Sequence, residues 1–115
     1  MSNFDSQPLK AGNYEGEVVS QELLKSKTDK PHFEIKFGRL VHEDGTEINP
    51  DVRRTVRLYL TEAALDFTLK KAASVGFSGL PSQFKLEDPD AISIIGNTGK
   101  LYMKIGEYGE DWDIS

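Results

Sequence analysis

The sequence RRTVRLYLTEAALDFTLKKAAS, residues 53–74, decides the fold because an alternating segment changes within it, without a break, into a helical one. Successive side chains of a strand point to opposite faces, so residues 53–60 predict a strand with one mostly apolar face. The other face carries two guanidinium groups and a phenol. Arg54, Val56, Leu58 and Leu60 share the apolar face, and Arg53, Thr55, Arg57 and Tyr59 share the opposite one.

Residues 61–74 predict a helix. Thr61 supplies an N-cap hydroxyl, Glu62 places an acid in the first turn, and Gly76 follows as a C-terminal stop. Small and apolar residues recur at helical spacing, which predicts one face packed on the core. These residues are Ala64, Leu65, Thr68, Leu69 and Ala72.

The rest of the chain alternates between strand patterns and turns. Strands are predicted at residues 12–24 with a bend at Gly16, at 32–40, at 101–105 and, very short, around 112–114. The turns are a basic loop at 25–31, a hairpin at 41–50 and a long irregular connection at 76–90. His32 is expected on the solvent side. One buried cluster is expected to contain Phe33, Ile35, Phe37, Val56, Leu58, Leu65, Leu69 and Ile105.

Length and composition fit a single domain, residues 1–115, with a short N-terminal leader and a short acidic C-terminal end. The absence of cysteine excludes disulfides and thiolate metal sites. We see no signal peptide and no membrane span, so we expect a cytoplasmic protein without membrane contact. The net charge of -5 is uneven, because residues 107–115 hold four acids and no cation. The body is therefore nearly neutral and can still bind a polyanion on a basic face.

This order of elements predicts a mainly β fold with one α-helix. Strand, basic loop, strand, hairpin, strand, helix, long connection, strand and short strand is typical of the oligonucleotide/oligosaccharide-binding (OB) architecture. We therefore expect a five-stranded OB-like Greek-key barrel with a helix between strands 3 and 4.

Several short segments carry a resemblance to a known group of proteins. Residues 9–14, 33–35 and 57–61, with a helix that ends before Gly76 and Phe77, resemble small phage-encoded OB-fold single-stranded-DNA-binding-like proteins of replication and recombination. The resemblance covers most of the chain. It implies a non-catalytic accessory protein that binds single-stranded DNA, in the host cell cytoplasm if phage-encoded. The acidic end resembles a reduced form of the acidic tails on some single-strand binders.

Signals for catalysis are weak throughout. His32 and His42 stand without cysteine or a zinc-binding spacing, and residues 96–100 lack the full phosphate-loop spacing. Acids in the turns, such as Asp88 and Asp90, are usually just solvated. We therefore expect no enzyme, no metal and no cofactor.

Two functions remain open from the sequence. In the first, cations meet phosphates and aromatic rings stack on bases of single-stranded nucleic acid. The expected residues are Lys25, Lys27, Lys30, Lys36, Arg53, Arg57, Tyr59 and Tyr102. In the second, the barrel binds a protein partner such as a nuclease or a replication enzyme, and the net acidity favours this alternative. Sequestration of Arg57 by Glu34 across the sheet would leave Arg53, Arg57 and Tyr59 as structural residues and would favour the second function.

The acidic end has its own two interpretations. In the first, the end is exposed, and it competes with nucleic acid for the basic face or presents Trp112 to a replication or recombination protein. In the second, Trp112 is a core residue of the last strand. The sequence leaves open the oligomeric state, including a homo-oligomer, and the preference for DNA or RNA.

Overall fold

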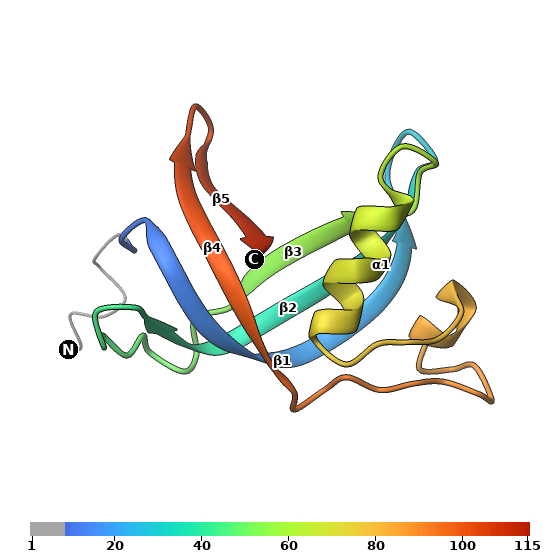
Figure 1. Ribbon diagram of the computed structural model, residues 1–115, viewed down its shortest axis with the longest axis horizontal. Coiled ribbons are helices and arrows are strands. Elements are labelled where there is room, and N and C mark those ends of the chain that lie inside the picture. Colours follow the sequence, from blue (N-terminus) through green and yellow to red (C-terminus); the bar gives the residue numbers. More distant parts are fainter. Residues whose placement is uncertain (1–8) are drawn as a thin grey trace.

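Alternating apolar and polar residues build five strands in the computed structural model, which describes residues 9–115 of the chain. The strands are β1 (Gly12–Lys25), β2 (Pro31–His42), β3 (Arg54–Tyr59), β4 (Thr98–Gly106) and β5 (Gly109–Ile114). The helix α1 (Leu65–Ser74) lies between β3 and β4, and a short 3-10 helix, η1 (Pro81–Phe84), follows it. The hairpin of β4 and β5 projects on one side of β3, and α1 lies on the other (Figure 1).

The strands form one antiparallel sheet in the order β3-β2-β1-β4-β5, so β3 and β5 are the outer strands. These two approach each other, and Nε of Arg54 in β3 lies 2.7 Å from Oε1 of Glu110 in β5. No backbone ladder joins β3 to β5 within residues 9–115, so the sheet is not closed. The predicted mainly β fold with a helix between strands 3 and 4 is confirmed. It is consistent with an OB-like barrel that is open at one seam.

The strand β1 bends at the predicted glycine. Its register against β2 shifts between Glu15 and Glu17, on either side of Gly16. A Cβ atom on Gly16 would lie 2.9 Å from Cδ2 of Leu40 and 3.2 Å from Cβ of Phe37, both in the core. Because any side chain here would collide with the core, glycine lets β1 curve closely over it and pair with both β2 and β4.

The helix α1 begins four residues later than predicted. Its N-cap is Ala64, with no side-chain cap, and the predicted cap Thr61 instead accepts the backbone N–H of Ala64 through its carbonyl. The predicted stop at Gly76 is confirmed, since Gly76 has a φ of 99° and donates its N–H to the carbonyl of Ala73. This is the left-handed helix end that glycine adopts without strain.

Five of the eight predicted core residues are buried, namely Phe33, Ile35, Phe37, Val56 and Leu58. The other three are wrong: Leu65 is half-buried, Leu69 is 37% exposed and Ile105 is 61% exposed. Two other residues of the predicted helix face, Thr68 and Ala72, are buried, and the hydroxyl of Thr68 donates to the carbonyl of Tyr59. Ile105 lies in the projecting hairpin, beyond the core.

The long connection after α1 supplies core residues that alternation did not predict. Phe84 of η1 stacks on Phe33 with ring centroids 4.0 Å apart, and Phe77 packs edge-on against Phe84 at 5.0 Å. Phe77, Phe84 and Ile94 are buried. The irregular segment therefore closes one end of the core.

The buried side chain of Gln21 in β1 fixes this connection. Its Nε2 donates to the carbonyls of Phe84 and Ile92, both at 3.0 Å, and its Oε1 accepts the N–H of Ile94 at 2.6 Å. One amide thus satisfies three backbone groups of a segment that has no ladder of its own.

Replacing Gln21 by Leu should destabilise the fold by roughly 2 to 3 kcal/mol, because a buried N–H and two carbonyls lose their partners. Urea unfolding followed by tryptophan fluorescence measures this loss. Glu22→Leu on the neighbouring, exposed position is the matched control and should change the unfolding free energy by less than about 0.5 kcal/mol. Equal stability of the Gln21 variant and the wild type would contradict the role assigned to this amide.

The acidic end is part of the sheet. Residues 109–114 form β5, Ile114 is buried, and the ring of Trp112 lies 4.8 Å from that of Tyr14. The carboxylates of Asp111 and Asp113 pair with Lys104 and Lys71 at 3.6 and 2.6 Å. Trp112 is half-buried and packs against the core, which agrees with the interpretation that it is a core residue of the last strand. The predicted leader lies mostly outside the described residues.

Within residues 9–115, no helix is long and apolar enough to cross a membrane.

Candidate nucleic-acid interface

The outer face of β2 and β3 has the composition predicted for it. Cross-strand pairs on this face are His32 with Tyr59, Glu34 with Arg57, and Lys36 with Thr55. The intervening residues, among them Phe33, Val56 and Leu58, point into the core. The alternation predicted from the sequence is therefore confirmed, and the side chains of Arg57 and Tyr59 are neighbours on one exposed face.

The basic loop after β1 folds back toward this face. Ser26 and Lys30 are joined through the Ser26 N–H and the Lys30 carbonyl at 2.9 Å, which closes the loop. The Pro31 carbonyl accepts the N–H of Leu60 at 2.9 Å, which ties the loop to the end of β3. Lys27 and Lys30 are exposed, and Lys25 forms a loose pair with Asp29 at 3.6 Å.

A pocket of about 540 Å³ forms where this loop meets the end of β3. The pocket is lined by Ser26, Lys27, Thr28, Lys30, Tyr59, Thr61 and Ala64. The structure thus brings together three predicted site residues, Lys27, Lys30 and Tyr59. Sequence reasoning missed Ser26, Thr28 and Thr61, and only their adjacency to the basic loop and to Tyr59 could have indicated them.

The ring of Tyr59 rests on a histidine. His32 was expected on the solvent side, but it is buried, and its ring centroid lies 5.2 Å from that of Tyr59. Its Nδ1 lies 3.4 Å from the Lys30 carbonyl. The expectation was wrong because the large side chain of Tyr59 covers this position from the neighbouring strand. The covered histidine supports the tyrosine ring from below and leaves part of that ring exposed.

Arg57 is paired, and this counts against one of our predictions. Its Nη2 lies 3.1 Å from Oε1 of Glu34 across the sheet, in the arrangement that weighs against Arg57 as a phosphate ligand. The arginine side chain is 54% exposed and the glutamate only 13%. The guanidinium therefore keeps donors toward solvent, but its charge is already partly neutralised.

The other predicted cations differ in position. Lys36 is exposed in the middle of β2 and makes no ion pair with a described residue. Arg53 lies just before β3, where its guanidinium covers Gly38 and donates to the carbonyl of Pro50. Lys36 therefore extends the basic face, whereas Arg53 holds the loop before β3.

Tyr102 lies elsewhere. It is exposed on β4, where its cross-strand neighbours are Asn13 of β1 and Asp113 of β5. In the sheet, β2 and β1 lie between β3, which carries Tyr59, and β4. Tyr102 therefore does not line the pocket beside Tyr59, and its role in nucleic-acid binding stays a prediction.

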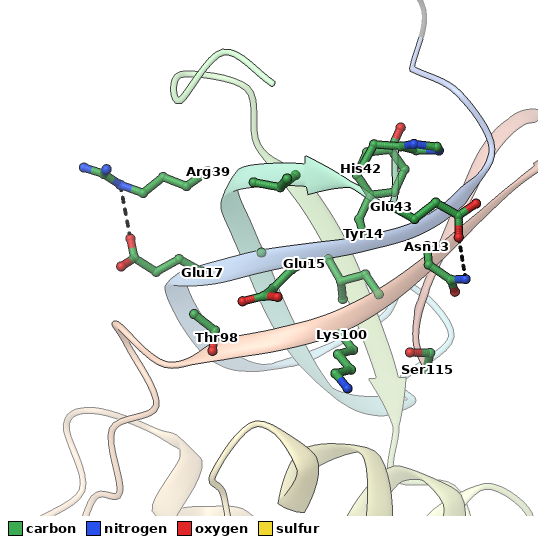
Figure 2. Close-up of a pocket in the computed structure, with 13 residues that line it drawn as sticks. Asn13, Tyr14, Glu15, Glu17, Arg39, His42, Glu43, Thr98, Lys100 and Ser115 are labelled. Carbon is green, nitrogen blue, oxygen red and sulfur yellow. Dashed lines mark hydrogen bonds and ion pairs between the residues drawn. The ribbon is translucent and has the colours of Figure 1, made fainter. Parts of the chain in front are cut away.

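A second hollow, of about 490 Å³, crosses β1 between the ends of β2 and β4. Two pairs of its polar side chains interact, as Figure 2 shows: Arg39 with Glu17 at 3.4 Å, and Asn13 with Glu43 at 2.8 Å. A hydrogen bond to the Ala11 carbonyl raises the pKa of His42 at this hollow. No group of three metal-binding side chains occurs within residues 9–115. Because three acids, Glu15, Glu17 and Glu43, line this hollow with two cations, Arg39 and Lys100, it offers less to a polyanion than the pocket beside Tyr59.

Neither a comparison with protein-family models nor one with curated proteins found a match to this chain.

Proposed function

We propose that this protein is a non-catalytic binder of single-stranded nucleic acid, of the phage replication and recombination accessory type. The observation that carries the proposal is the pocket lined by Lys27, Lys30 and Tyr59. Binding of single strands without sequence preference requires a basic groove for the phosphates and an aromatic ring on which a base can stack. The two lysines provide the first element and the exposed ring of Tyr59 provides the second.

In this proposal the backbone and the bases are bound by different groups. Phosphates lie against Lys27 and Lys30 in the loop, with Lys25 nearby, and one base stacks on Tyr59. Such a stack contributes about 1 to 3 kcal/mol. Lys36 continues the path along β2, and Arg57 contributes less than a free arginine because a phosphate must share it with Glu34.

Salt titrations of binding separate these roles. Fluorescence anisotropy with labelled single-stranded and duplex DNA, at low and moderate salt, should show preferential single-strand binding. Lys27→Gln and Lys30→Gln should each weaken binding of all sequences and make the log-log salt dependence shallower by roughly 0.7. Tyr59→Ala should lower affinity roughly tenfold or more with the slope nearly unchanged. Arg57→Ala should change the log-log slope by less than the roughly 0.7 expected for one lost phosphate contact, because Glu34 already partly neutralises this arginine.

Two matched variants control for general effects. Tyr108→Ala removes an exposed tyrosine from the turn between β4 and β5, and Lys85→Gln removes a lysine from the connection after η1. Both should bind like the wild type. Absence of binding to single-stranded and duplex DNA, or equal losses in all variants, would transfer the function to the alternative.

That alternative is a protein that binds a partner such as a nuclease or a replication enzyme through the same barrel. Two observations favour it: the net charge of -5, and the pairing of Arg57 with Glu34. A complex that forms with such an enzyme and survives moderate salt, without any affinity for DNA, would support it.

A further inference from the structure

The strand β1 is paired along only part of one edge. Its ladder with β4 covers Gly12 to Glu17, and two further hydrogen bonds join Val18 to Gly96 and Asn97. The strand continues to Lys25, and on that side residues 20–25 have no backbone partner among residues 9–115. Because alternate residues of a strand direct N–H and C=O groups to each edge, this stretch presents unpaired donors and acceptors.

A groove runs along this free edge. Its volume is about 620 Å³, and its walls are residues 20–24 of β1 on one side and residues 85–87 with Ile95 on the other. Leu24, Leu86 and Ile95 are all exposed here although they are large apolar residues. These three side chains offer apolar contacts to a ligand that lies in the groove.

The far wall of the groove is held in place from within. Gln21 bonds the backbone at Phe84, Ile92 and Ile94, so the segment that carries Leu86 and Ile95 is attached to β1 at a fixed distance. The groove is therefore preformed, and a ligand need not order this segment on binding.

The charges around the groove favour a basic ligand. Glu22 lies opposite Glu34 in the β1–β2 register, and Glu34 is already paired with Arg57. Neither Glu22 nor Glu87 makes an ion pair with a described residue, and both line the groove, where Lys85 is the only cation among its described lining residues. A cation supplied by a ligand would therefore find a free carboxylate at Glu22, whereas Glu34 beside it already has a partner.

We propose that this groove binds an extended segment of a partner protein, which adds as a strand to the free edge of β1. The segment has apolar side chains at alternate positions, which contact Leu24, Leu86 and Ile95, and a lysine or arginine that reaches Glu22. Main-chain hydrogen bonds supply affinity in this mode, and the alternate side chains supply specificity. The groove is separate from the pocket beside Tyr59, so the proposal stands independently of nucleic-acid binding.

A capped peptide of alternating valine and threonine with a lysine at each end is the probe. Titrated to about 1 mM into the isotope-labelled protein, it should shift and protect backbone amides of residues 20–24. The same peptide with alternate backbone amides N-methylated should not bind, because it cannot donate to β1. Glutamates in place of the lysines should weaken binding by about threefold or more, and Glu22→Gln should remove most of that difference.

Leu24→Lys and Leu86→Lys place a cation in the groove at exposed positions, repel the lysines of the peptide and should abolish its binding. Ile105→Lys, at an exposed position in the β4–β5 hairpin, is the matched control and should leave it unchanged. No binding at this concentration, or equal binding of the N-methylated peptide, would overturn the proposal. Concentration-dependent self-association that Leu24→Lys abolishes would also overturn it, because a second copy would then cover the edge.

Discussion

Phe33→Ala should lower the free energy of unfolding by about 3 to 5 kcal/mol, a large part of the stability of a domain of this size. The ring of Phe33 is fully buried, stacks on Phe84 at 4.0 Å and meets Phe77 at 5.4 Å. Its removal leaves a cavity between β2 and the connection after α1, and neither wall can collapse into it, because Gln21 fixes that connection to β1. Urea unfolding, followed by fluorescence and circular dichroism together, measures the loss.

Phe67→Ala provides the control for this prediction. Phe67 is exposed on α1, so its truncation should change the unfolding free energy by no more than about 0.5 kcal/mol. Similar losses for the two variants would contradict the assignment of Phe33 to the centre of the core.

Truncation after Gly109 should cost roughly 5 kcal/mol or more and should leave little folded protein at room temperature. It removes the half-buried Trp112, the buried Ile114 and the whole hydrogen-bonded pairing of β5 with β4. It also removes Glu110. Burial raises the pKa of this carboxyl, but hydrogen bonds from Arg54 and Trp112 lower it by more, so the pKa of Glu110 lies below its ordinary value. Circular dichroism of the truncated chain tests this expectation.

A truncated chain that keeps the wild-type unfolding midpoint would contradict this prediction and would show that β5 does not stabilise the fold.

Competition between the acidic end and nucleic acid has to be tested in a variant that keeps β5. The double variant Asp111→Asn with Asp113→Asn keeps β5 and removes two exposed carboxylates. If the carboxylates compete for the basic face, this variant should bind single-stranded DNA more tightly at low salt.

Alternation predicted the strands well, because burial of one face imposes a period of two on the sequence. Phe33, Ile35 and Phe37 in β2, with Val56 and Leu58 in β3, form the part of the core that the sequence predicted. The order of elements then predicted the fold class, since one helix between the third and fourth strands restricts the possible topologies.

Tertiary contacts decided what periodicity could not. Of the predicted helix face, Thr68 and Ala72 are buried, and the hydroxyl of Thr68 bonds the carbonyl of Tyr59, whereas Leu65 and Leu69 are not buried. The irregular connection contributes Phe77 and Phe84 because its backbone is held by Gln21, a polar residue that no hydrophobic pattern includes. Thr68 and Tyr59 are 9 positions apart and Gln21 and Phe84 are 63 apart, so the periodicity of one strand or helix does not predict these contacts.

The candidate site shows the same division. The grouping of Arg57 and Tyr59 on one face follows from alternation, and the basic loop was recognisable from its composition. The basic loop lies beside Tyr59 because the Leu60 N–H bonds the Pro31 carbonyl. Arg57 pairs with Glu34 because the register of β2 against β3 places them opposite each other. Composition predicts neither contact. Tyr102 does not line the pocket beside Tyr59, because β2 and β1 lie between its strand and that of Tyr59 in the sheet.

Amide chemical-shift mapping with an unlabelled thymidine oligonucleotide tests the proposed function most directly. At low salt, single-stranded DNA should shift the amides of residues 26–30 and 57–61, with the largest changes at Lys27, Lys30 and Tyr59. The same shifts should shrink steeply as salt is raised, because the contacts are mainly to phosphates. Shifts confined to other faces, or a spectrum that the oligonucleotide leaves unchanged, would contradict nucleic-acid binding at the pocket beside Tyr59.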